Sequence, residues 1–178
     1  YVIAFNGEVY NHPALRAELS SKGQAPSWRG NSDTETILAG FDAWGIDTTV
    51  SKMVGMFGLA VWDKKNREII LIRDRMGEKP LYYGWQGNTF LFASELKALK
   101  VHPQFNAEIN RNALASFMRH GYIPAPHSIY TGIKKLPPGN LIKIPLGEPR
   151  ESKPIKYWSL ENAAHYGLQV PFAGSDSD

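Results

Sequence analysis

The sequence predicts an α+β domain, in which antiparallel strand pairs and separate helices pack as layers. Two pairs of short apolar runs carry this prediction, because each pair is joined by a short polar turn as in a β-hairpin: residues 56–62 with 68–73, and 81–85 with 89–93. Helical patterns stand before and after these hairpins and do not alternate with single strands. A parallel fold built from βαβ units is therefore not expected.

The first expected elements are a strand and two capped helices. Apolar residues lead into Asn6-Gly7-Glu8, where we expect the strand to end. Asn11 can cap the first helix, which is expected to end at Gly23. Ser32-Asp33-Thr34-Glu35 fits a capping box, and an apolar stripe continues from it to Gly45. The second helix should fill that interval.

The later elements follow the hairpins. Ser94 is placed as the N-cap of a short helix up to Lys100, and Asn110 can cap another helix that stops at Gly121. The polar segment 161–178 is typical of a linker, or of the cap of a helix that begins beyond it. Two short strands are also expected in the proline-rich part of the chain: 141–144 and 155–158.

Composition narrows the classes of function. The chain has 178 residues, of which 43% are hydrophobic, a net charge of +3 and no cysteine. Its Lys and Arg residues are scattered, which argues against a nucleic-acid partner. No apolar run approaches the roughly 18 residues of a membrane span, so no membrane association is expected. The lack of cysteine excludes disulfides and thiolate metal sites, and it fits a cytoplasmic protein.

The segment Asn6-Gly7-Glu8 presents an amide, a bare backbone and a carboxylate together. Asn6 could donate its side-chain amide and Gly7 its backbone N–H, while Glu8 could hold a cationic group. Asp33, in the first turn of the second helix, adds an acid. Such a set could hold an amino acid beside a developing oxyanion. The alternative is a tight Asn-Gly turn and an ordinary helix start, and spacing alone favours it.

Other reactive or charged residues point to structural roles. The charges of the segment 73–79 follow a strand, and such charges commonly clamp a loop through backbone hydrogen bonds. Ser94 lies in no nucleophile-elbow pattern, so it is not expected to be a nucleophile. The histidines lack the spacing of metal ligands, and no metal site is predicted. A glycine-rich phosphate loop is also missing, so no cofactor is expected within this chain.

Five blocks of the sequence form a recognisable series. They are Phe5-Asn6-Gly7-Glu8-Val9-Tyr10-Asn11, Asn31-Ser32-Asp33-Thr34-Glu35, Met56-Phe57-Gly58-Leu59-Ala60, Arg73-Asp74-Arg75-Met76-Gly77-Glu78-Lys79-Pro80-Leu81-Tyr82-Tyr83 and Ala93-Ser94-Glu95-Leu96-Lys97-Ala98-Leu99. In this order and spacing they resemble the N-terminal glutaminase domain of glutamine-hydrolysing asparagine synthetases, which are class II glutamine amidotransferases. The resemblance implies an N-terminal-nucleophile hydrolase fold, an αββα sandwich of two antiparallel sheets between helix layers.

The resemblance also implies roles for the candidate residues. Asn6 and Gly7 would form the oxyanion hole, and Glu8 and Asp33 would contact L-glutamine, with Asp33 on its α-ammonium group. The nucleophile of the family is an N-terminal cysteine. Because this chain has no cysteine, we expect that residue and its short strand to lie before Tyr1. Without a thiolate the isolated chain should lack glutaminase activity.

A larger parent enzyme is implied as well. Residues 1–160 would be the type-2 amidotransferase domain without its first strand and nucleophile, and 161–178 a linker toward a synthetase domain beyond Asp178. That domain would use ATP and Mg²⁺ to activate aspartate, which ammonia then attacks. The expected partners are therefore L-glutamine and the synthetase domain, and a homodimer is left open.

Two alternatives stand beside an asparagine synthetase. One is a relative similar to β-lactam synthetases, in which the first domain lacks the cysteine and the second domain activates another carboxylate. The other is a catalytically silent module that only docks on a partner. The sequence does not decide the acceptor substrate, because the acceptor pocket would lie in the synthetase domain.

Overall fold

The computed structural model describes residues 1–147, 152–171 and 174, and in them the strands form two antiparallel sheets. The larger sheet has the order β1 (Val2–Val9), β2 (Gly55–Asp63), β3 (Glu68–Arg73), β7 (Asn140–Pro145) and β8 (Ile155–Lys156). The smaller sheet has the order β5 (Thr89–Ala93), β4 (Tyr82–Gln86) and β6 (Ile133–Lys135). Both expected hairpins are confirmed, since β2 pairs with β3 and β4 with β5.

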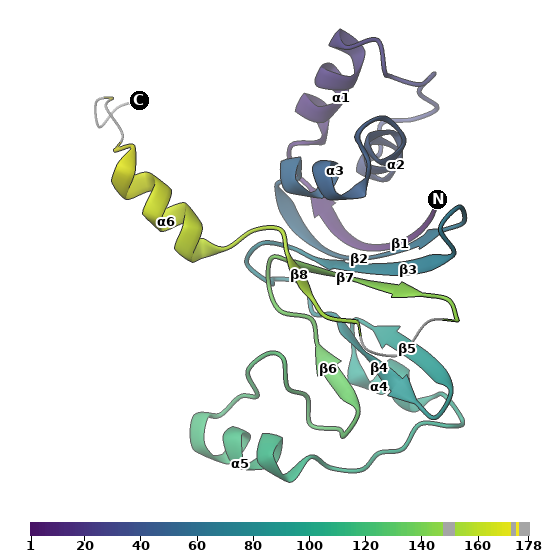
Figure 1. Cartoon of the computed structure of the whole chain (residues 1–178), viewed down its shortest axis with the longest axis vertical. Coiled ribbons are helices and arrows are strands. Elements are labelled where there is room, and N and C mark those ends of the chain that lie inside the picture. Colours follow the sequence, from purple (N-terminus) through teal and green to yellow (C-terminus); the bar gives the residue numbers. More distant parts are fainter. Residues whose placement is uncertain (148–151, 172–173, 175–178) are drawn as a thin grey trace.

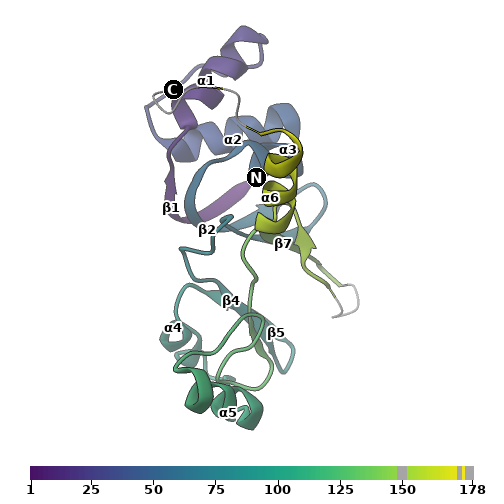
Figure 2. The same ribbon diagram turned by 90° about the vertical axis from the view of Figure 1, so that its left-hand side faces the viewer.

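Helices lie on the outer side of each sheet (Figure 1). On the larger sheet they are α1 (His12–Ser21), α2 (Asp33–Trp44) and α3 (Ile46–Lys52). Beyond the smaller sheet they are α4 (Leu96–Lys100) and α5 (Arg111–His120), as the turned view also shows (Figure 2). This is the αββα sandwich that the resemblance implied.

The strands send alternate side chains into two apolar cores. Leu59 of β2 points toward the helices and packs in one cluster with Phe41 of α2. Its neighbour Ala60 points the other way and packs with Leu71 and Leu136 between the sheets. The position of a side chain along β1 or β2 therefore decides whether it faces the helices or the smaller sheet.

The expected strand end at Asn6-Gly7-Glu8 was wrong. β1 continues through these residues to Val9, and each of them pairs with β2. Asn6 lies opposite Gly58, and Gly7 lies opposite Phe57. The tight-turn alternative for Asn6-Gly7 is wrong for the same reason, because pairing with β2 holds the backbone extended.

The caps agree with the sequence only in part. Asn110 and Ser32 cap α5 and α2 as expected. Asn11 stands before α1 without capping it, because its amide group instead donates to the Lys52 carbonyl oxygen at 2.9 Å and accepts from the Val54 N–H at 2.8 Å. Those backbone groups lie between α3 and β2 and need partners. The helix α3 and the strand β6 were not expected from the sequence.

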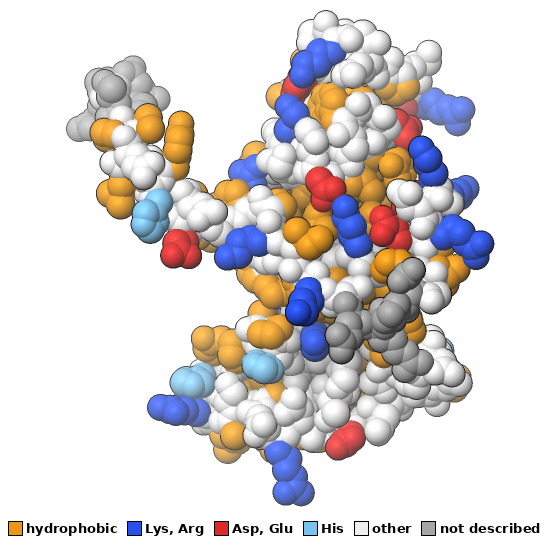
Figure 3. Space-filling view, in the orientation of Figure 1, with side chains coloured by type: hydrophobic (Ala, Val, Ile, Leu, Met, Phe, Trp, Pro, Cys, Tyr) orange, Lys and Arg blue, Asp and Glu red, His pale blue; other side chains and the backbone are white. Residues whose placement is uncertain are grey.

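The segment expected as a linker begins with a helix, α6 (Leu160–Gln169). Ser159 caps it, since its Oγ accepts from the Asn162 N–H at 3.1 Å. The helix extends away from the body of the domain (Figure 1), and hydrophobic side chains lie on its surface (Figure 3), among them Tyr166 and Leu168. Its role as a linker stays a prediction, and residues 172–173 and 175–178 lie outside the described part of the chain.

The side chain of Arg73, at the end of β3, joins the two sheets. Arg73 is buried, with only 7% of its surface exposed. Its guanidinium donates to the carbonyl oxygens of Gly77 at 2.6 Å, Lys79 at 2.7 Å and Leu136 at 2.7 Å. Gly77 and Lys79 belong to the loop that leads into β4, and Leu136 follows β6. Burial lowers the pKa of Arg73, against the opposing effect of Asp74, but an arginine remains charged at neutral pH.

Asp74 holds the same loop from its other side. Its carboxylate accepts from the backbone N–H groups of Glu78 and Lys79, each at 2.9 Å, and of Phe57 on β2 at 3.3 Å. The side chain of Asp74 is buried, so these bonds act in a region of low dielectric. The expected structural role of the charges in segment 73–79 is confirmed for Arg73 and Asp74.

Replacement of Arg73 by lysine should destabilise the domain strongly. Lysine keeps the charge but lacks the planar fork that reaches several carbonyl groups at once. We expect the free energy of unfolding, measured by urea denaturation, to fall by about 3 kcal/mol, because buried acceptors lose their donors. The control Arg119→Lys, on the exposed side of α5, should change it by less than about 0.5 kcal/mol. Equal stability of Arg73→Lys and the parent chain would contradict the role of Arg73.

The turn between β2 and β3 predicts a pH effect at Asp63. Burial acts to raise its pKa, but hydrogen bonds from Asn66 and the Lys65 N–H outweigh burial, so the pKa lies below the ordinary value of 3.8. A lowered folded pKa stabilises the domain above that ordinary value, and the stabilisation disappears as the pH falls through the folded pKa. In Asp63→Asn, urea titrations should give a free energy of unfolding that varies less between about pH 4 and pH 2. An unchanged slope would exclude this contribution.

Candidate functional site

Alternate side chains of β1 face opposite sides of the larger sheet. Ile3 and Phe5 pack against the cluster on the helix side. Asn6 faces the smaller sheet, and Glu8, two residues further on, shares that direction. Both side chains are exposed. The structure thus places two of the predicted site residues on one face of an edge strand.

A cavity of about 230 Å³ lies between β1 and the smaller sheet. Ala4 and Asn6 line it from β1, Gly58 lines it from β2, and Phe92 and Ser94 line it from the smaller sheet. Nδ2 of Asn6 donates to Oγ of Ser94 at 3.1 Å. Ser94 was expected to cap α4, but Glu95 occupies the N-cap position, so that expectation was wrong. Polar groups of both sheets therefore meet at this cavity.

Gly7 brings the backbone of β1 very close to β2. Its φ is 153°, and a Cβ atom at this position would lie 2.0 Å from the Met56 carbonyl oxygen and 2.6 Å from Cα of Phe57. Both the torsion and the contact require glycine. Residue 7 can therefore offer backbone groups but no side chain.

Asp33 reaches the end of β1 from the helix layer. It is the first residue of α2, and its carboxylate accepts from the Val9 N–H at 3.0 Å and the Thr34 N–H at 2.7 Å. Val9 follows Glu8, so Asp33 is fixed to the strand that carries the other candidate residues. Asp33 is not among the residues that line the cavity at Asn6. The structure brings it to the end of β1 rather than to that cavity.

Several carboxylates act on Tyr10, the residue that directly follows β1. Desolvation is the largest cause that raises the pKa of the Tyr10 hydroxyl, and the carboxylates of Glu78, Glu8 and Asp74 raise it further. Glu78 lies in the loop between β3 and β4, and from the sequence only a structural role was expected for it. A group of carboxylates at an exposed strand end favours a cationic ligand group. No local sequence signal joins Glu78 to Tyr10, and the hydrogen bond from the Glu78 N–H to Asp74 holds the loop that carries Glu78.

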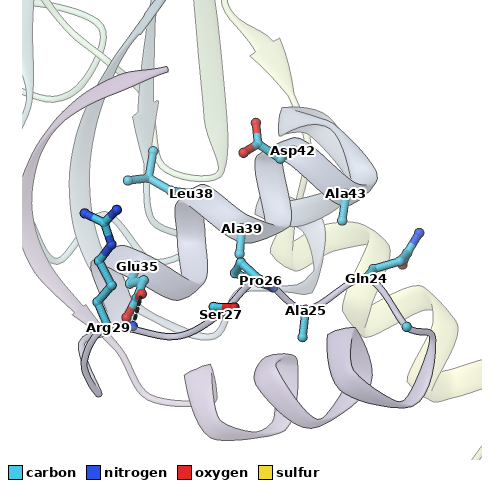
Figure 4. Close-up of a pocket in the computed structure, with 11 residues that line it drawn as sticks. Gln24, Ala25, Pro26, Ser27, Arg29, Glu35, Leu38, Ala39, Asp42 and Ala43 are labelled. Atoms are coloured by element: carbon cyan, nitrogen blue, oxygen red, sulfur yellow. Dashed lines mark hydrogen bonds between the residues drawn. The ribbon is translucent and has the colours of Figure 1, made fainter.

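A second hollow lies between α2 and the loop of residues 23–29 (Figure 4). Its volume is about 540 Å³, and the Arg29 N–H donates to Glu35 at 2.7 Å at its edge. None of the predicted site residues lines it.

Within the described residues we find no cluster of His, Asp and Glu that could hold a metal ion. The same part of the chain has no helix long and apolar enough to cross a membrane.

Comparison with known families accounts for nearly the whole chain. Residues 1–158 match the glutamine amidotransferase domain family. The chain belongs to this family. The order of the five sequence blocks reflects that membership.

Relatives of this amidotransferase domain include asparagine synthetases. It is 35% identical over 167 residues to the glutamine-hydrolysing asparagine synthetase 3 of Bacillus subtilis. That alignment covers 93% of this chain and 26% of the Bacillus protein. It is also 35% identical over 161 residues to a putative glutamine-hydrolysing asparagine synthetase 2 of Methanocaldococcus jannaschii, covering 89% of this chain and 30% of that protein. The chain thus spans less than a third of the length of these relatives.

A solved structure supports the fold of the amidotransferase domain. Glutamine phosphoribosylpyrophosphate amidotransferase from B. subtilis, complexed with ADP and GMP, superposes with a TM-score of 0.59 at 20% sequence identity. The match covers 88% of this chain and 29% of that one. The expected α+β fold of the N-terminal-nucleophile hydrolases is confirmed.

Substitution of Gly7 tests the close approach of β1 to β2. Gly7→Ala should lower the free energy of unfolding by about 3 kcal/mol or more in urea denaturation, because its Cβ meets backbone atoms that cannot move aside. Gly23→Ala is the matched control, since Gly23 has a φ of 65° but open space around it. That control should cost only about 1–2 kcal/mol from the torsion. Equal losses would show that the contact with β2 is unimportant.

Proposed function

We propose that this chain is the glutamine-binding domain of an asparagine synthetase, or of a closely similar ATP-dependent amidotransferase. The observation that carries the proposal is the placement of Asn6, Gly7 and Glu8 on one edge strand, where the Asn6 side chain lines a cavity. Membership of the glutamine amidotransferase family supports glutamine as the ligand. The names of the relatives favour aspartate as the acceptor.

Asn6 and Gly7 would stabilise negative charge on the side-chain oxygen of glutamine. Attack on the amide carbon turns its carbonyl oxygen into an oxyanion, which fixed N–H donors stabilise more than the ground state. Two features support this role. The Asn6 side chain lines the cavity, and Gly7 is its direct neighbour on the same edge strand.

Glu8 and Asp33 would bind the α-ammonium group of glutamine. The side chain of Glu8 is exposed near the end of β1, and the hydrogen bond from the Val9 N–H fixes Asp33 at the same strand end. The amide end of the ligand would lie toward Asn6 and its α-ammonium end toward Glu8. This order would place the reacting amide in the partly enclosed region between the sheets.

The complete reaction needs groups that these residues do not supply. A cysteine thiolate from outside this chain would attack the amide carbon, ammonia would leave, and water would hydrolyse the thioester to glutamate. We further propose that the ammonia passes to a synthetase domain, where ATP and Mg²⁺ activate aspartate. A β-lactam-synthetase-like enzyme would activate another carboxylate instead. We also propose that the parent works in the cytoplasm, which the lack of cysteine in this chain fits.

Titration calorimetry with L-glutamine tests the binding site. The chain should bind L-glutamine, and Glu8→Gln should weaken the affinity about tenfold, because a charge-assisted bond to the ammonium group is lost. The control Glu161→Gln, on the exposed helix α6, should bind like the parent chain. Absence of heat at millimolar L-glutamine would contradict the proposal and favour a silent docking module.

Glutamine turnover should be absent from the isolated chain. Its 178 residues contain no cysteine, so no thioester with glutamine can form. An ammonia assay on the purified chain should therefore match the buffer blank over many hours. Ammonia release that is lost in Asn6→Ala would mean that another nucleophile of this chain does the chemistry.

A further inference from the structure

We propose that Ser94 is a positioning residue that fixes the amide group of Asn6, so that one Nδ2–H bond stays directed toward the cavity between the sheets. The proposal rests on the proposed glutamine-binding role of Asn6. It assigns to Ser94 neither nucleophilic chemistry nor a helix cap.

The contact joins the two sheets across the candidate site. Asn6 lies on β1, the edge strand of the larger sheet, and Ser94 directly follows β5, the edge strand of the smaller sheet. Nδ2 of Asn6 donates to Oγ of Ser94 at 3.1 Å, and both residues line the same cavity of about 230 Å³. The residue that orients Asn6 thus comes from the opposite wall of the cavity.

The chemistry of an amide explains why its orientation matters. A rotation by half a turn exchanges the NH₂ group of asparagine with its carbonyl oxygen. In one orientation the side chain donates a hydrogen bond to an oxyanion, and in the other it presents lone pairs that repel the oxyanion. A serine hydroxyl can accept from Nδ2 or donate to Oδ1 of an amide. In the structure Nδ2 of Asn6 donates to Oγ of Ser94, so one N–H is used by the hydroxyl and the second remains as a donor.

The surroundings of Ser94 leave its hydroxyl to this contact. Serine at a strand-to-helix junction commonly caps the helix. Here Glu95 holds the N-cap position of α4, and its side chain makes no cap bond. Oγ of Ser94 instead meets a residue that lies 88 positions earlier in the chain. A serine that faces a candidate oxyanion donor fits a positioning role better than a local structural one.

Nuclear magnetic resonance of the unmutated chain tests the contact directly. One Nδ2 proton of Asn6 should show a nuclear Overhauser effect to the Ser94 side chain, and both side-chain amide signals of Asn6 should shift in Ser94→Ala. In Ser94→Thr, which keeps the hydroxyl, they should stay near their original positions. An Asn6 amide that shows no contact with Ser94 would overturn the proposal.

Glutamine affinity tests the consequence for the site. We expect Ser94→Ala to raise the dissociation constant for L-glutamine about five- to tenfold, and Ser94→Thr to restore it. Thr89→Val is the matched control, because Thr89 lies on β5, the strand that Ser94 follows, and its hydroxyl bonds to Gln104 at 3.0 Å, away from Asn6. Thr89→Val should bind glutamine like the parent chain.

The two measurements separate this proposal from the proposed function. Equal affinities of Ser94→Ala and the parent chain, or an equal loss in Ser94→Thr, would overturn the positioning role. A parent chain that binds no glutamine would refute the proposed function, while the contact between Asn6 and Ser94 would still be decided by the magnetic resonance spectra.

Discussion

The buried guanidinium of Arg73 fixes how the two sheets of this domain meet. It stands at the end of β3 in the larger sheet, and it bonds to carbonyl groups of segments that border the smaller sheet. Two further hydrogen bonds hold the backbone of the same turn. The Tyr157 hydroxyl donates to the Arg73 carbonyl oxygen at 2.7 Å, and the Gly139 N–H donates to the Asp74 carbonyl oxygen at 2.8 Å. Burial raises the pKa of Tyr157, which keeps this donor protonated. Segments distant in sequence thus converge on one turn.

The geometry of the candidate site depends on this arrangement. Asn6 reaches the cavity from the larger sheet, and Ser94 reaches it from the smaller one, so their contact requires a fixed spacing between the sheets. Asp74 holds the loop that carries Glu78, and the carboxylate of Glu78 helps to raise the pKa of the Tyr10 hydroxyl. A charge pair that looked purely structural in the sequence therefore also holds a loop whose charge acts just beyond the end of β1.

The sequence predicted what local patterns control. Both hairpins, the caps of α2 and α5 and the structural role of Arg73 and Asp74 follow from signals within a few residues of one another. The path of Asn6-Gly7 could not be predicted in this way. Its partner strand β2 lies far along the chain, and pairing with it overrides the turn preference of an Asn-Gly dipeptide. The hydrogen bonds of Asn11 and Ser94 were missed for the same reason, because their partners are distant in sequence.

The chemistry of the candidate residues singled them out in the sequence, the resemblance implied their roles, and their spatial relation came from the fold. Asn6, Gly7 and Glu8 share one strand, while Asp33 joins its end through the Val9 N–H. A crystal structure of this chain with L-glutamine tests this arrangement most directly. We predict the side-chain oxygen of glutamine within hydrogen-bond distance of Nδ2 of Asn6, with the α-ammonium group against Glu8 and Asp33. Glutamine bound only in the hollow between α2 and the loop of residues 23–29 would contradict the assignment.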